Sequence, residues 1–87
     1  MAWNNLGVAL QDAGRLAEAI DAYRTALELH AEYDNWYETG NTLHNLALIH
    51  AAGDPTAART AWLQAADAYT RADAPTEAAA ARRRAQQ

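Results

Sequence analysis

Two pairs of matching stretches, Trp3–Leu10 (WNNLGVAL) with Leu43–His50 (LHNLALIH) and Ala19–Ala26 (AIDAYRTA) with Ala58–Ala65 (ARTAWLQA), decide the fold. The second copy follows the first after 40 residues in the first half of the unit and after 39 in the second half. Recurrence at such a period is typical of a repeat array, in which each unit buries its apolar face on the next. Such arrays usually bind or scaffold other molecules, so the pattern favours a surface function over catalysis.

Helical periodicity runs through the whole chain. Leu6, Gly7 and Leu10 fall on one helical stripe, and later stripes are separated by a break at Gly14, at 34–35 and at 53–54. Pro75 opens a last helix that ends in three arginines, where positive charge complements the helix dipole. We expect one all-α domain over residues 1–87, with a first helical hairpin at about 2–33, a second at about 36–72 and a final helix at about 75–85.

Composition limits the function classes. About half of the 87 residues are apolar, but most of these are alanine, so we expect a thin core around the three tryptophans and four tyrosines. The net charge of −4 argues against nucleic-acid binding, and the absence of cysteine excludes disulfides and thiolate zinc sites. No apolar run is long enough to span a membrane and no signal peptide is present, so we expect a cytoplasmic protein without membrane contact. Arginine without lysine, together with abundant alanine, indicates a GC-rich bacterial source.

The spacing of large, small and aromatic residues resembles the tetratricopeptide repeat. The residues that carry the resemblance over about 2–72 are Trp3, Leu6, Gly7, Leu10, Ala19, Tyr23 and Ala26, then Leu43, Leu46, Ala47, Ala58, Trp62 and Ala65. The resemblance implies a superhelix of two antiparallel hairpins, with an aromatic residue filling the wedge between the helices of each hairpin. The period of about 40 residues and the Pro-led last helix are similar to a longer subclass, the C-terminal repeat tails of bacterial signalling proteins. The last helix would then be a capping helix.

The resemblance also implies a concave groove lined by the first helix of each hairpin. The residues expected to contact a peptide or a partner domain there are Asn4, Asn5, Gln11, Asn41, His44 and Asn45. An amide offers both a donor and an acceptor, so stacked asparagines can hold an extended main chain. Alternatively, Asn5 and Asn45 bond within the array. The lysine-containing carboxylate clamp of chaperone-binding relatives is missing, because the chain contains no lysine.

Metal binding and catalysis have little support in the sequence. His44 and His50 are six residues apart, about 240° around a helix, and therefore cannot share one face. The pairs Asp21/Arg24 and Asp67/Arg71 have the spacing of ordinary helix salt bridges. Serine is absent, and there is neither a glycine-rich phosphate loop nor a convergent carboxylate pair. We therefore expect no enzyme activity, no metal and no cofactor.

Two functions remain open. The chain is expected to be a protein-interaction module, the C-terminal part of a larger regulatory protein, in which Asn45→Ala would weaken a partner and leave stability nearly unchanged. Alternatively, it is a structural end segment that caps a longer array and has no ligand of its own. The leading face around Val8 and Ala9, without a capping turn before it, would also favour self-association.

Overall fold

The computed structural model describes residues 3–87, and the side chains of residues 5–87. Within these residues the chain forms five helices and no strand, which confirms the all-α prediction. Short turns join successive helices into two antiparallel hairpins and a final helix. The helices are α1 (Trp3–Asp12), α2 (Leu16–Glu32), α3 (Trp36–Ala51), α4 (Pro55–Arg71) and α5 (Pro75–Ala85).

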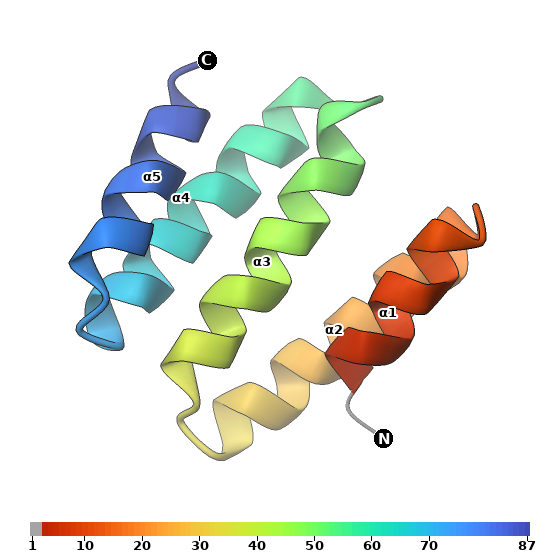
Figure 1. The fold of residues 1–87 in the computed structure, drawn as a ribbon, viewed down its shortest axis with the longest axis horizontal. Helices are drawn as coiled ribbons and strands as arrows, with labels where there is room; N and C mark the ends of the chain where they lie inside the picture. Colours follow the sequence, from red (N-terminus) through yellow and green to blue (C-terminus); the bar gives the residue numbers. More distant parts are fainter. Residues whose placement is uncertain (1–2) are drawn as a thin grey trace.

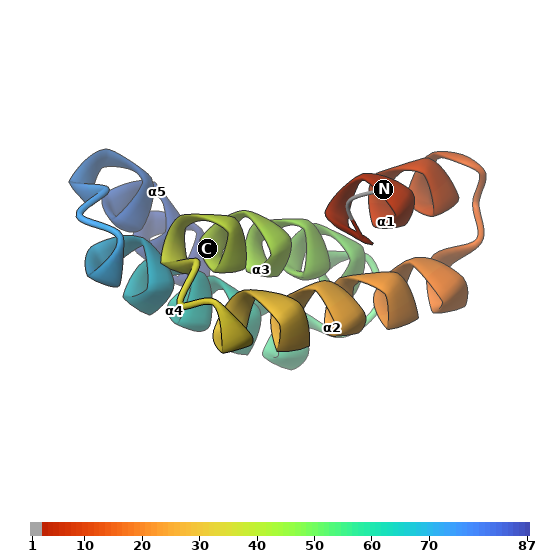
Figure 2. The same ribbon diagram turned by 90° about the horizontal axis from the view of Figure 1, so that it is seen from below.

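The helices are arranged in two layers (Figure 1). Helices α1, α3 and α5 form one layer and α2 and α4 form the other, so the array is only two helices thick and measures 31 × 31 × 16 Å. Viewed from the side, α1 and α5 rise on either side of α3 (Figure 2). The surface made by α1, α3 and α5 is therefore concave, and we call it the concave face.

Local sequence sets the helix boundaries. The Asn35 side chain accepts a hydrogen bond from the Glu38 N–H at 3.4 Å, and Asp54 accepts one from the Ala57 N–H at 3.1 Å. These bonds satisfy backbone donors that the first turns of α3 and α4 leave without intrahelical partners. Asp34 and Asp73 turn the chain with φ of 51° and 58°, a left-handed conformation that a short polar side chain tolerates.

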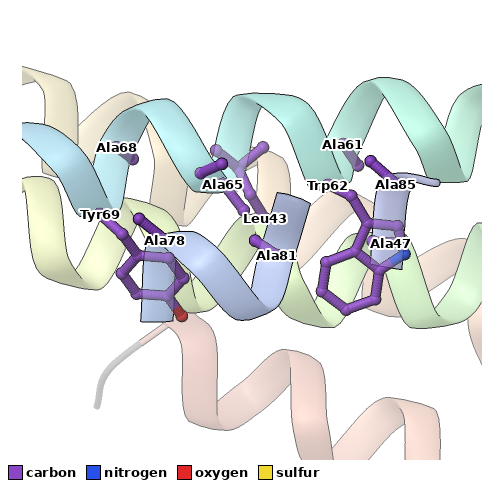
Figure 3. Close-up of a cluster of buried hydrophobic side chains, with 11 residues drawn as sticks. Leu43, Ala47, Ala61, Trp62, Ala65, Ala68, Tyr69, Ala78, Ala81 and Ala85 are labelled. Carbon is purple, nitrogen blue, oxygen red and sulfur yellow. The ribbon is translucent and has the colours of Figure 1, made fainter. Parts of the chain in front are cut away.

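The larger core lies in the second hairpin and under α5 (Figure 3). Seven of its side chains are alanines from α4 and α5, and Leu43, Trp62 and Tyr69 supply most of the bulk. Trp62 lies beside Ala85 and Tyr69 lies beside Ala78, near opposite ends of α5. Because alanine adds one methyl group to the backbone, these helices approach one another closely.

A smaller core joins the two hairpins. Ala19 and Tyr23 of α2 pack with Leu46 of α3, and Leu27 and Ile49 cover them in part. The expectation that all four tyrosines anchor the core is wrong for two of them. Tyr33 is 76% exposed because it lies at the C-terminal cap of α2, and Tyr37 is 44% exposed on the first turn of α3.

Candidate functional site

Each hairpin contains a glycine that allows a tyrosine ring to lie against the inner helix. A Cβ atom added to Gly40 would lie 2.7 Å from the Tyr69 ring, and one added to Gly7 would lie closer still to the Tyr23 ring. Both tyrosines are buried. Only glycine therefore fits the two crossings as they stand, and each ring fills the wedge between the two helices of its hairpin.

The hydroxyls of these two tyrosines hold amide side chains near the concave face. The Tyr23 hydroxyl donates a hydrogen bond to Oε1 of Gln11 at 3.0 Å, and the Tyr69 hydroxyl donates to Oδ1 of Asn41 at 2.6 Å. Burial raises the pKa of Tyr69 to about 12, with the nearby Tyr37 and Glu77 adding to the effect. The hydroxyl therefore remains a donor throughout the physiological pH range.

His44, Trp62 and Arg84 form a cluster that links α3, α4 and α5. Its ring meets the Trp62 ring edge-on, with 4.8 Å between centroids and an interplanar angle of 89°. The Arg84 guanidinium lies over the Trp62 ring at 5.1 Å from its centroid. Burial, together with the positive charge of Arg84, lowers the pKa of His44, so its neutral form is favoured.

A second aromatic group lies near the start of α3. The Tyr37 and Tyr69 rings meet at 63° with 5.7 Å between centroids. The hydrogen bond between the Tyr37 hydroxyl and the Glu77 carboxylate raises the pKa of Tyr37. The negative charge of Glu77 raises it further. Arg71 of α4 lies 4.8 Å from the centroid of the Trp36 ring. Aromatic and charged side chains thus brace the second hairpin at its middle and at the start of α3.

The predicted groove residues fall into three groups. Gln11, Asn41 and His44 are half-buried and held by the aromatic side chains of the outer helices. Asn5 is exposed on α1, and Asn45 is half-buried on α3 with an interaction partner of its own. The Asn4 side chain lies outside the described residues. The structure therefore describes five of the six expected side chains, all on α1 and α3, and it shows aromatic partners for three of them.

The Gly40–Tyr69 crossing and the role of Arg84 were not predicted from the sequence. The available signal for the first was a glycine inside a helical stretch, with a tyrosine seven residues after the matched Trp62. For Arg84 no signal was available, because three consecutive arginines look alike in sequence. Only the fold shows that Arg84 stacks on Trp62, whereas Arg82 donates a hydrogen bond to Thr70 at 3.0 Å.

Only one of the two predicted helix salt bridges forms. Arg71 and Asp67 pair at 3.0 Å, as expected, whereas Asp21 and Arg24 form no ion pair. Both residues of the absent pair are exposed, where such a contact adds little stability. An unpredicted pair joins Arg15 and Glu18 at 2.6 Å.

Neither catalytic geometry nor a metal centre emerges from the described side chains. Among residues 5–87 no three His, Asp or Glu side chains lie together in a way that could hold a metal ion. From residue 3 onward no helix is both long enough and apolar enough to cross a membrane. What the arrangement offers is a concave surface with oriented amides.

Comparison with known proteins identifies a family. The family model described as the tetratricopeptide repeat matches residues 1–71, which cover α1 to α4. Searches of curated proteins and of solved structures find no match.

Proposed function

Since this chain belongs to the tetratricopeptide repeat family, we propose that its concave face binds a peptide or a partner domain. Repeats of this family are non-catalytic modules that generally mediate protein–protein interaction. The concave face made by α1, α3 and α5 supplies a surface for such a partner (Figure 2).

The orientation of the Gln11 and Asn41 amides carries the proposal. In both, the oxygen accepts a tyrosine hydroxyl, so the NH₂ group remains to donate to a ligand. Backbone carbonyls of an extended peptide are suitable acceptors for such donors. Because the tyrosines fix the amides before a ligand arrives, binding costs less side-chain entropy than it would with free side chains.

The proposed contact surface combines these amides with their neighbours. Val8 on α1 and Leu48 on α3 are each 39% exposed and add apolar area. We propose that the peptide or partner domain contacts Asn4, Asn5, Gln11, Asn41, His44 and Asn45.

A peptide-display selection on the purified chain tests the proposal. Peptides enriched on the wild type should be lost on Asn5→Ala/Asn45→Ala, because both amides lie on the proposed contact surface. Gln64→Ala provides a matched control, since it removes an exposed amide from the outer helix α4. Equal loss on both variants would contradict binding in the concave face.

A second function, a structural end segment, is favoured by α5. This helix buries Ala78, Ala81 and Ala85 against the second hairpin, as a capping helix would. Under that function no peptide is enriched, and the amide substitutions change stability alone or nothing. The display selection distinguishes the two functions, and circular dichroism melts of the same variants show whether a loss of binding reflects a loss of stability.

The setting of the module is part of the proposal. We propose that it is the C-terminal part of a larger regulatory protein in the bacterial cytoplasm, as its composition and long period suggest. Self-association through the leading face is a further part. That face was predicted around Val8 and Ala9, and Leu6 and Leu10 of the same helix line a cleft of about 260 Å³ between α1 and α2. A strict monomer at high concentration, measured by light scattering, would contradict self-association.

A further inference from the structure

A positively lined cleft lies at the end of the second hairpin. It has a volume of about 220 Å³ and is formed by the end of α3, the start of α4 and the end of α5. Helix α5 has 11 residues against 17 in α4, so it leaves the first turns of α4 uncovered. Leu48, Pro55 and Ala58 contribute apolar walls. The charged side chains of the lining are those of Arg59 and Arg84, and Gln87 also lines the cleft. We call this site the Arg84 cleft.

The Arg84 guanidinium is held in place before any ligand arrives. It stacks on the Trp62 ring at 5.1 Å, and that ring is in turn fixed edge-on by His44. A stacked guanidinium retains its in-plane N–H donors, because the stacking uses only its face. Trp62 itself is 5% exposed and therefore gives the guanidinium a rigid support.

Neither arginine of the cleft is neutralised by the protein. Among residues 5–87 the ion pairs are Arg15–Glu18 and Arg71–Asp67, and both lie elsewhere. The first turn of α4 is capped by the Asp54 carboxylate, so the positive charge of the cleft comes from the two arginine side chains. The cleft thus concentrates positive charge in a chain whose net charge is −4.

We propose that the Arg84 cleft receives an acidic side chain of a peptide bound in the concave face. This inference rests on the proposed function and names the chemistry of the ligand. The carboxylate would lie between Arg59 and Arg84, and its methylene stem would pack on Leu48 and Ala58. A nucleic acid is a poorer occupant, because a net negative chain repels a polyanion whereas a small cleft accepts a single carboxylate.

A display selection tests the inference when each library peptide is joined to further chain at both ends. No free C-terminal carboxylate is then present in the peptide, so only side-chain carboxylates are available. Enriched peptides should share one fixed Asp or Glu position. Replacing that residue by its amide, or Arg84 by glutamine, should each weaken binding about tenfold, as for loss of a charged hydrogen bond. The two changes together should cost much less than the product of the two effects, because they remove the same contact.

Arg83→Gln is the matched control. It removes the same charge from the same turn of α5, but Arg83 neither lines the cleft nor stacks on a ring. Its effect on affinity should stay within about twofold, as expected for a solvent-exposed charge. Equal effects of Arg83→Gln and Arg84→Gln would overturn the inference.

Arg59→Gln tests the cleft without disturbing the Trp62 packing, and it is decisive if Arg84→Gln fails to fold. It should also weaken the acidic peptide severalfold and leave the amide version of that peptide unchanged. Enriched peptides without a fixed acidic position would overturn this inference and leave the proposed function standing. Absence of any enriched peptide would overturn both.

Discussion

Both hairpins pack a tyrosine ring against a glycine, but at positions that do not correspond in the repeat. In the first, Gly7 lies under Tyr23, whose hydroxyl holds Gln11 one turn further along α1. In the second, Gly40 lies under Tyr69, whose hydroxyl holds Asn41, the next residue of α3. Tyr69 is not the sequence counterpart of Tyr23, however, because that position is occupied by Trp62. The second hairpin therefore has two aromatic plugs where the described part of the first has one.

The difference follows from helix length and from α5. Helix α3 has 16 residues and crosses α4 over a longer contact than the 10 described residues of α1 make with α2. A longer crossing needs a second filler, and Tyr69 supplies it. Helix α5 then lies over both aromatic side chains, with Ala85 beside Trp62 and Ala78 beside Tyr69 (Figure 3). Matching positions of the two repeats therefore need not have the same role in packing.

Trp62→Ala should have the largest effect. Truncating a buried aromatic side chain costs about 3–5 kcal/mol, and here it also removes the support of His44 and Arg84. Urea unfolding should show the loss, and hydrogen exchange should show faster exchange in α5. Tyr23→Ala should lower the free energy of unfolding by a similar amount. In that variant, however, hydrogen exchange in α5 should be no faster than in the rest of the second hairpin. Equal exchange in α5 for both variants would break the comparison.

Gly40→Ala and Gly7→Ala should each destabilise the chain by about 1–3 kcal/mol. The new methyl group collides with a buried tyrosine ring, and this overpacking outweighs a helix-propensity gain of about 1 kcal/mol. Gly53→Ala is the matched control, because nothing lies within 4 Å of its added Cβ. It should be neutral or slightly stabilising in the same thermal melts. A neutral Gly40→Ala would show that the Tyr69 ring can move aside.

Tyr69→Phe should cost about 1 kcal/mol by loss of one hydrogen bond to a half-buried amide. Tyr23→Phe should cost less, because its bond to Gln11 is longer, at 3.0 Å against 2.6 Å, and the Gln11 side chain is more flexible. Urea unfolding of the two variants side by side measures the difference. A larger loss of stability for Tyr23→Phe than for Tyr69→Phe would indicate instead that Gln11 is held more firmly than Asn41.

Acidification should weaken the second hairpin through His44. Burial and Arg84 lower the pKa of His44 in the folded chain, whereas in the unfolded chain the imidazole keeps its ordinary value of 6.5. Unfolding therefore takes up a proton, so stability is full above pH 6.5 and falls as the pH drops below it. Thermal melts from pH 7.5 to 5.5 should show a smaller decrease for His44→Gln than for wild type. An identical decrease would assign the dependence to other groups.

Much of the architecture could be predicted from sequence, because helix periodicity and breaks are local. Five helices follow from the spacing, whereas the wedge position of Tyr23 and the burial of Trp62 follow from the resemblance to the tetratricopeptide repeat. The Tyr69 crossing could not be predicted in the same way, because Gly40 and Tyr69 lie 29 residues apart and outside the matching stretches. Only the angle between α3 and α4 brings them together.

The candidate site was less predictable than the fold. Helical position places Gln11, Asn41 and His44 on the inner helices, but it does not reveal that aromatic partners from the outer helices hold them. The reach of a long side chain is also hidden from the sequence. Arg84 was expected only to complement a helix dipole, and it proved to stack on Trp62.

The alanine contacts of α5 have a consequence for the shape of the concave face. A leucine can change rotamer to absorb a misfit, whereas Ala78, Ala81 and Ala85 have no adjustable part. The close approach of the backbones at these alanines therefore sets the tilt of α5 directly. A single Ala81→Val would not be absorbed locally. The larger side chain would change the tilt of the whole of α5. The width of the opening between α3 and α5 would therefore also change at positions far from residue 81.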